Sequence, residues 1–272
     1  MYLTVNSHKT YCYTGGKALD AAKPTIVFIH GVLNDHSVWG LQSRYLANHG
    51  WNVLAVDLPG HCKSEGDVPS SVEEAADFVV ALLDAAGVAS AALVGHSWGS
   101  LIALEAASKL KAGASHLVMV GTAYPMKVST ALLDASLNEP MKALQMINMF
   151  SRSTLAPPPS ALGPGTWVYG ASMALGRRVL ASNPKVNVFH IGFKACDNYA
   201  NGEQAIANIT CPVLFVLGEQ DQMTQAKAAQ TLIEKARSSG KTVKVETLAV
   251  GHHQMTEAPE ETLFAIFKFI NV

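Results

Sequence analysis

Short runs of apolar, often β-branched residues recur along this chain of 272 residues and alternate with longer stretches of helical pattern. Continuous apolar runs of this length are typical of parallel strands that are buried on both faces of a sheet. The runs that we interpret as strands are residues 25–29, 53–57, 92–94, 117–120, 213–217 and 242–247. The pattern therefore predicts an α/β fold in which helices cover both faces of a mostly parallel sheet.

Two segments of alternating pattern are expected at the edges of this sheet. Residues 3–13 alternate loosely and predict an antiparallel hairpin, and residues 242–247 alternate apolar and polar side chains as a half-exposed strand does. Start and stop signals place helices at about residues 71–87, 98–113, 224–240 and 259–270. Either Ser70 or Ser71 can close a capping box at the first of these helices, because each precedes a glutamate by three residues.

The segment between about Gly121 and Ala207 breaks the alternation of strand and helix. It contains five of the nine methionines, a Pro-Pro-Pro sequence at 157–159 and no clear buried strand. We interpret residues 122–207 as a helical cap that is inserted into an α/β core formed by residues 1–121 and 208–272.

The composition limits the partners of the chain. Twenty basic and 21 acidic residues give a net charge of -1 and form no basic run, which argues against a nucleic-acid ligand. No stretch approaches the roughly 18 apolar residues of a membrane span, and the N-terminus lacks a signal-peptide pattern. The four cysteines show neither a C-x-x-C pair nor a histidine at ligand spacing, so no metal is expected. We expect a cytoplasmic monomer or homodimer that acts on a small molecule.

The most informative motif links an apolar run to the next helix and reads Gly95-His96-Ser97-Trp98-Gly99. A G-x-S-x-G sequence in a strand–turn–helix setting is the signature of a nucleophile elbow. Glycines at its two ends remove side chains that would clash in so sharp a turn. The helix N-terminus favours negative charge that develops near the serine. Ser97 is therefore the predicted nucleophile.

A serine hydroxyl becomes a good nucleophile only when a neighbouring base takes its proton. His252 lies in the loop that leaves the last predicted strand, from which it could reach Ser97 across the sheet edge. His253 remains the alternative base. His30 and His96 flank glycines at strand ends and are expected to make structural hydrogen bonds, whereas the other histidines are expected in loops or at the surface.

The base in turn needs an acid that holds its tautomer. Asp221 follows the strand predicted at 213–217 and lies between Ser97 and His252 in the order serine, acid, histidine. Glu219, in the same loop, is the alternative acid.

Backbone N–H groups are expected to stabilise an oxyanion beside the serine. Gly31 follows the first long strand and should let the chain turn so that the N–H of Val32 points into the site. The N–H of Trp98 would be the second donor. The residues predicted to line the substrate pocket lie near strand ends or in the cap and are Leu33, Tyr124, Met149 and Met223.

Taken together, these motifs resemble those of the α/β-hydrolase superfamily. The resemblance also includes the His30-Gly31 turn with Trp39 downstream, Asp57-Leu-Pro-Gly-His61 with Ser64, Gly218-x-x-Asp221, and Gly251-His252 followed by Glu257-x-Pro259-Glu260. It runs from about residue 24 to the C-terminus with the cap unmatched, and it departs at Cys62, where a glycine is usual. It implies an eight-stranded sheet, a cap between strands six and seven, and no cofactor.

The resemblance implies acyl transfer, in which Ser97 attacks a carbonyl, His252 shuttles the proton and water releases the acyl enzyme. We expect a small to medium, largely uncharged ester or lactone as substrate. Haloalkane dehalogenases and epoxide hydrolases of the superfamily use aspartate at the elbow, so the serine argues against both. Carbon–carbon bond hydrolysis, cofactor-free perhydrolysis and hydroxynitrile lyase chemistry share the same three residues and remain alternatives.

Two further readings stay open. A ligand receptor or pseudoenzyme on the same scaffold is the alternative outside enzymes. A proline-type aminopeptidase shares the three catalytic residues but needs acidic groups in the cap to hold a free amino terminus. The acidic residues available for that role are Asp134, Glu139, Asp197 and Glu203.

Overall fold

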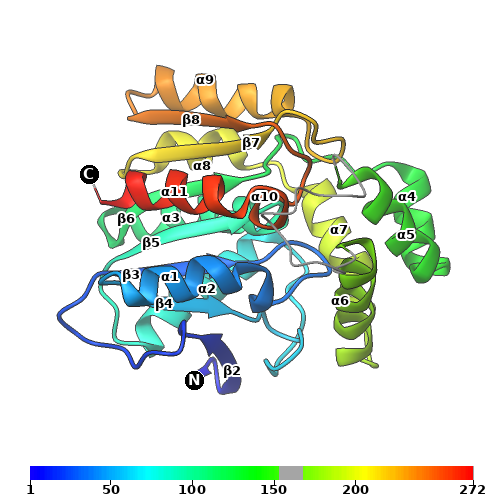
Figure 1. The fold of residues 1–272 in the computed structure, drawn as a ribbon, viewed down its shortest axis with the longest axis horizontal. Helices are drawn as coiled ribbons and strands as arrows, with labels where there is room; N and C mark the ends of the chain where they lie inside the picture. The colour runs from blue at the N-terminus through cyan, green and yellow to red at the C-terminus, as the bar shows by residue number, and fades with distance from the viewer. Residues whose placement is uncertain (153–167, 272) are drawn as a thin grey trace.

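A computed structural model describes residues 1–152 and 168–271 and confirms the predicted fold class. Eight strands of these residues form one sheet in the order β1-β2-β4-β3-β5-β6-β7-β8 (Figure 1). The hairpin of β1 and β2 is antiparallel, β2 joins β4 in antiparallel pairing, and every later pairing is parallel. The strands are β1 Tyr2–Val5, β2 His8–Tyr13, β3 Thr25–Ile29, β4 Asn52–Val56, β5 Ala91–His96, β6 Ala114–Val120, β7 Val213–Gly218 and β8 Val243–Leu248.

Helices cover both faces of the sheet, which explains the continuous apolar runs (Figure 1). One face is covered by α2 Val72–Ala85, α3 Trp98–Leu110, α8 Gly202–Asn208 and α9 Gln230–Ser238. The other is covered by α1 Gly40–Asn48 and α11 Pro259–Ile270, which follows the short α10 Gln254–Glu257. Short 3-10 helices occupy His36–Trp39, Lys111–Gly113 and Ala226–Ala229. Every residue of β3, β4, β5 and β7 is buried, whereas β8, at the edge of the sheet, is only partly buried.

Both serines of the predicted capping box are used at the start of α2. The hydroxyl of Ser71 accepts a hydrogen bond from the N–H of Glu74 at 3.1 Å. The carboxylate of Glu74 turns back and accepts hydrogen bonds from the N–H and the hydroxyl of Ser70. The helix therefore begins with its free N–H groups partly satisfied.

Four helices between β6 and β7 lie together beyond one end of the sheet (Figure 1). They are α4 Thr130–Asn138, α5 Pro140–Phe150, α6 Val168–Ser182 and α7 Val188–Asn198. They share an apolar cluster that includes Leu144, Met173 and Phe189. By contrast, α8 packs against α3 and contributes to the apolar layer of the sheet, although its sequence falls within the segment predicted as cap. The three prolines at 157–159 lie outside the described residues.

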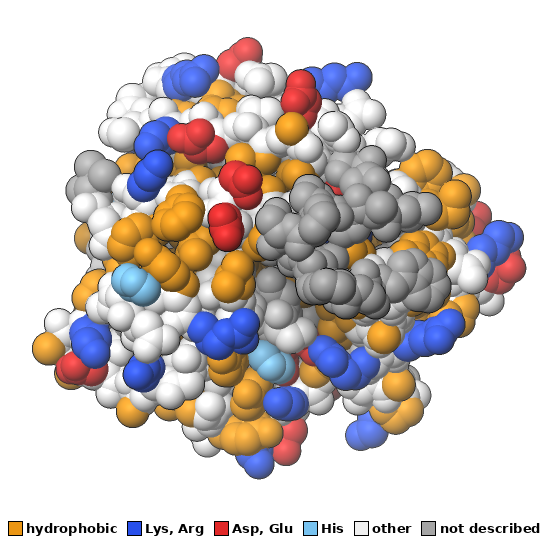
Figure 2. Space-filling model, viewed as in Figure 1, with side chains coloured by type: hydrophobic (Ala, Val, Ile, Leu, Met, Phe, Trp, Pro, Cys, Tyr) orange, Lys and Arg blue, Asp and Glu red, His pale blue; other side chains and the backbone are white. Residues whose placement is uncertain are grey.

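The surface carries charges of both signs. Figure 2 shows basic and acidic side chains interspersed over the visible face, with apolar side chains between them. Within the described part of the chain, no helix is both long enough and apolar enough to cross a membrane.

Candidate active site

Ser97 lies in a sharp turn between the end of β5 and the start of α3. Its backbone angles, φ 53° and ψ -120°, are a strained conformation for a residue with a side chain. A Cβ on Gly95 would lie 1.9 Å from the carbonyl oxygen of Gly99, and a Cβ on Gly99 would lie 2.4 Å from that of Ile29. The two glycines of the motif are therefore required by close backbone approach. They allow the turn that exposes the Ser97 side chain.

His252 and Asp221 are hydrogen-bonded to each other at the same end of the sheet. The Nδ1 atom of His252 lies 2.8 Å from Oδ2 of Asp221, and both residues are buried. The other carboxylate oxygen, Oδ1, accepts from the N–H groups of Met223 and Thr224, each at 2.8 Å. Burial alone would raise the pKa of Asp221, but the charge and hydrogen bond of His252 and those from Thr224 outweigh it. The pKa of Asp221 is therefore lowered.

Thr224 completes this arrangement. Its hydroxyl oxygen lies 2.8 Å from Oδ2 of Asp221, 3.0 Å from Nδ1 of His252 and 2.9 Å from the carbonyl oxygen of Gly121. The helix predicted to begin near Thr224 begins two residues later as the 3-10 helix Ala226–Ala229, and α9 follows it. Thr224 thus belongs to the loop that holds the carboxylate.

The backbone of His252 is also held in place on both sides of its side chain. Its N–H donates to the carbonyl of Ser151 at 2.7 Å, and its carbonyl accepts from Nε2 of His96 at 2.7 Å. Burial, together with the neighbouring His252, lowers the pKa of His96 to about 3, so its ring stays neutral at ordinary pH. His30 similarly accepts a hydrogen bond from the N–H of Leu58. Both histidines have the structural hydrogen bonds expected for them.

The alternative acid and base are placed differently. The side chain of Glu219 is exposed and makes no hydrogen bond to a described residue. The half-buried ring of His253 lies 5.7 Å from that of His252 and has no described carboxylate as partner. One further expectation is wrong, because His61 is buried, with its ring tilted 45° against that of Trp98 at 6.0 Å, instead of lying at the surface.

Of the two predicted oxyanion donors, Trp98 follows Ser97 directly in the chain, and Val32 lines the same two cavities as Ser97. The N–H of Trp98 is the first of helix α3, and such N–H groups have no acceptor within the helix. The N–H of Val32 has no acceptor among the described residues. Gly31 was expected to allow the turn, but the left-handed residue of the turn is Leu33, with φ 56°. Gly31 instead leaves room for its neighbours, because a Cβ there would lie 3.0 Å from Nδ1 of His96 and 3.2 Å from Cβ of Ser97.

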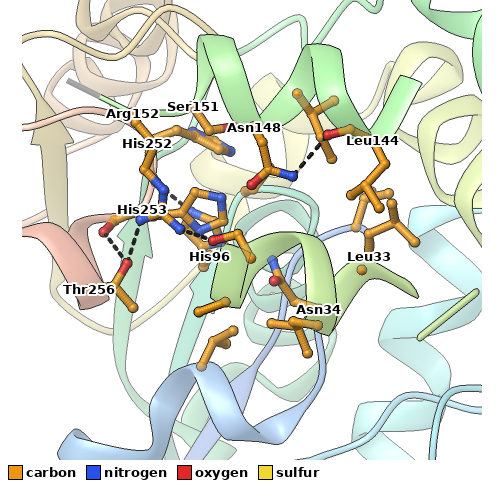
Figure 3. Close-up of a pocket in the computed structure, with 18 of the residues that line it drawn as sticks. Leu33, Asn34, His96, Leu144, Asn148, Ser151, Arg152, His252, His253 and Thr256 are labelled. Carbon is orange, nitrogen blue, oxygen red and sulfur yellow. Dashed lines mark hydrogen bonds between the residues drawn. The ribbon is translucent and has the colours of Figure 1, made fainter. Parts of the chain in front are cut away.

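Two cavities meet at Ser97 and His252. The larger, about 490 Å³, is named here the Arg152 cavity, and Figure 3 shows Arg152 beside His252, His253 and Thr256, opposite Leu33, Asn34 and Leu144. The smaller, about 320 Å³, is named the Met126 cavity, and its apolar lining includes Met126, Val128, Leu132, Met146 and Phe150. Val32, Phe193 and Met223 line both.

The predicted pocket residues divide into two pairs. Leu33 lines the Arg152 cavity and Met223 lines both cavities. Tyr124 lines neither cavity, because its ring is buried against Gly202 and its hydroxyl donates to the carbonyl of Ala200 at 2.6 Å. Met149 also lies outside both cavities, since its side chain on α5 is 65% exposed. The geometry does not support these last two as pocket residues.

Three described residues could bring ligand atoms together for a metal ion, and all three are already engaged. They are Asp35, His36 and Asp57, whose ligand atoms lie within 4.8 Å of one another. The carboxylate of Asp57 is 2.7 Å from Nδ1 of His36, and that of Asp35 is 2.6 Å from Arg178. Burial opposes ionisation of Asp35, but hydrogen bonds from Ser37 and from Arg178 prevail and lower its pKa to about 2.

Comparison with known proteins identifies the family. Residues 26–265 match the profile of the alpha/beta hydrolase family. The chain belongs to this family. An epoxide hydrolase of Caballeronia sordidicola is 33% identical over 89 residues, which are 32% of this chain and 27% of that protein. The aligned regions thus span only about a quarter to a third of the curated relatives it matches.

Solved structures of an enol-lactonase and of an esterase show the same fold over the whole chain. The enol-lactonase from Burkholderia xenovorans superimposes with a TM-score of 0.80 at 19% identity, covering 100% of both chains. An esterase from Exiguobacterium antarcticum superimposes with a TM-score of 0.82 at 16% identity, covering 100% of this chain and 99% of the other. At these identities, the likeness establishes the fold alone.

Proposed function

We propose that this alpha/beta hydrolase is a serine hydrolase that cleaves small to medium esters or lactones through an acyl-enzyme intermediate. Ser97 is the nucleophile, His252 the general base and Asp221 the acid that orients it. The observation that carries the proposal is the buried His252–Asp221 hydrogen bond of 2.8 Å, beside two cavities that Ser97 and His252 both line.

The mechanism follows from the proton positions that this hydrogen bond favours. Because Nδ1 of His252 faces the ionised Asp221, the proton resides there and Nε2 is left as an acceptor. Nε2 takes the Ser97 proton as the oxygen attacks the substrate carbonyl, and it then returns the proton to the leaving alcohol. The N–H groups of Val32 and Trp98 stabilise the oxyanion. Water, activated in the same way, releases the acid and restores Ser97.

The cavities support the proposed substrate size and the expected apolar contact. Volumes of about 490 and 320 Å³ are typical of small-molecule pockets, which range from roughly 300 to 1,000 Å³. The similarity to an enol-lactonase and an esterase fits this substrate class, although those likenesses are of fold. The similarity to an epoxide hydrolase covers only 32% of the chain. Epoxide hydrolases of the superfamily use aspartate at the elbow, and the serine at this position here argues against that activity.

One alternative loses support from the structure. An aminopeptidase would need acidic groups in the site for a substrate amino terminus. No Asp or Glu side chain of the described residues lines either cavity. The four candidates are exposed or bound elsewhere: Asp134, Glu139, Asp197 and Glu203.

Labelling with a fluorophosphonate tests the proposal directly. The parent protein should be labelled and the Ser97→Ala variant should not, while its melting temperature stays the same. Ser97→Ala should also lose at least about a thousandfold in kcat on p-nitrophenyl esters, because the triad acts as a unit. Within the series from acetate to palmitate, kcat/KM should peak at short or medium chains. Labelling that persists in Ser97→Ala would identify a different nucleophile, and no labelling of the parent would favour a receptor.

A further inference from the structure

Arg152 is a buried cation in the proposed site. It follows α5, lines the Arg152 cavity together with Ser97 and His252, and is only 6% exposed. Burial lowers its pKa to about 10, which the charge of Glu257 opposes, so the guanidinium stays charged at neutral pH. Burying such a charge is costly unless an anion or strong hydrogen bonds compensate it.

The partners of Arg152 leave much of this charge uncompensated. Its Nη1 donates to the hydroxyl of Thr256 at 2.8 Å, and its Nη2 donates to the hydroxyl of Ser172. Both acceptors are neutral, and Nε has no hydrogen-bond partner among the described residues. No ion pair within 4.0 Å joins Arg152 to a carboxylate of the described residues, although the charge of the buried Glu257 favours the charged form of Arg152.

The described lining of the cavity contains no acidic side chain that could neutralise Arg152. The second arginine that lines it is Arg178, which is already paired with Asp35 at 2.6 Å. Asn34 presents a side-chain amide, whereas the amide nitrogen of Asn148 already donates to the carbonyl of Leu144 at 2.8 Å. No Asp or Glu of the described residues lines this cavity. Apolar side chains are numerous in both cavities, but no arginine lines the Met126 cavity, and Lys127 is the only charged side chain among the described residues that line it. The two spaces that meet at Ser97 therefore suit different chemical groups.

We propose that the Arg152 cavity binds an anionic substituent of the substrate, a carboxylate being the simplest, while an apolar group occupies the Met126 cavity. This inference rests on the proposed function and deepens it. It replaces the uncharged substrate expected from the sequence with an ester or lactone that carries one negative charge. A carboxylate can take two hydrogen bonds from a guanidinium, which provides both affinity and orientation.

Arg152 could instead serve only as a structural link. Ser151, its neighbour, accepts the backbone hydrogen bond of His252, and Thr256 lies on α10. A purely structural role predicts that loss of Arg152 weakens turnover of charged and neutral substrates equally. An anion site predicts a change in their ratio, which is the quantity to measure.

Matched ester pairs provide that ratio. The first pair is mono-p-nitrophenyl glutarate, which has a free carboxylate, and methyl p-nitrophenyl glutarate, in which that carboxylate is esterified. The second pair is 4-butyryloxybenzoate and methyl 4-butyryloxybenzoate. The two pairs place the charge on the acyl and the leaving group, respectively. In at least one pair, Arg152→Gln should lower the charged-to-neutral ratio of kcat/KM by about 10- to 100-fold, the contribution of a hydrogen bond between charged groups. Arg152→Lys should keep part of the preference.

Thr256→Val and Ser172→Ala are the matched controls, since each removes a hydrogen bond of Arg152 and leaves its charge. The ratio should stay within about threefold of the parent in both controls. The proposal is overturned if Arg152→Gln changes neither ratio by more than about threefold, or if Thr256→Val changes it as much.

Binding to Ser97→Ala tests the anion site without turnover or any change at Arg152. By calorimetry, glutarate should bind at least about tenfold more tightly than dimethyl glutarate. Equal binding, or none, would overturn the anion site even if esters are hydrolysed. Failure of the proposed function would appear separately, as an unlabelled Ser97 in the parent.

Discussion

Replacing Thr224 with valine tests whether its hydroxyl positions the acid and base. The carboxylate of Asp221 has four neighbouring donors: two backbone N–H groups, Nδ1 of His252 and the Thr224 hydroxyl. Thr224→Val preserves the shape of the side chain and removes one of the four. A hydrogen bond to a charged group contributes about 1.5–3 kcal/mol. Because three donors remain, we expect the lower figure, which corresponds to about a tenfold fall in kcat.

Steady-state kinetics on one p-nitrophenyl ester, with Thr224→Ser as the control, distinguish this role from a structural one. The serine variant keeps the hydroxyl and should stay within about twofold of the parent, with KM unchanged in both variants. If the hydroxyl instead donates to Gly121, which lies 2.9 Å away, valine should lower the melting temperature and leave kcat unaffected. Equal kcat values for the valine and serine variants would refute the positioning role.

Two further predictions concern the carboxylates. Asp221→Asn should reduce kcat by about four orders of magnitude, because an amide holds the wrong tautomer of His252, whereas Glu219→Gln should stay within a few-fold of the parent; the opposite ranking in the same ester assay would reassign the acid. Asp35 has a pKa lowered from 3.8 to about 2, so its ionised form stabilises the fold by about 2 kcal/mol above pH 4, and this contribution is lost as the pH falls towards 2. Urea unfolding should therefore show Asp35→Asn to be less stable than the parent at pH 7 and equal to it near pH 2, and a difference that persists at pH 2 would contradict this.

The sequence was sufficient to predict the sheet and the elbow because both depend on strong local constraints. Strands such as Val213–Gly218 are buried on both faces, so nearly every residue must be apolar and the run is visible without a partner. The elbow depends on two glycines whose absent side chains leave room for backbone atoms. The cap helices are less constrained individually, and α8 shows that a helix can fall in the cap by sequence and still pack on the sheet.

The pocket could not be predicted in this way, because its lining depends on how distant segments meet. Tyr124 follows a strand end and was expected to face the substrate, but Gly202 provides a site into which its ring packs. Thr224 carried a weak signal, since it follows Asp221 by three residues, yet the same spacing reads equally well as the start of a helix. Arg152 has no local motif at all. Only the structure shows that Arg152 is buried and that its two described partners are hydroxyl groups, the observations on which the proposed anion site rests.

The contacts of His252 also explain why substrate binding in the cap should influence catalysis itself. The residue that fixes the His252 backbone N–H is Ser151, at the end of α5, and the next residue is Arg152 in the cavity wall. A ligand that binds Arg152 therefore contacts the same segment whose Ser151 carbonyl holds the backbone of His252, the proposed base. A displacement of the base by even about 1 Å can cost a hundredfold in rate. A substrate that fills the Arg152 cavity should therefore have a higher kcat as well as a lower KM. If His252 is the base and Arg152 binds the substrate as proposed, substrate selection and proton transfer are linked through two consecutive residues of the chain.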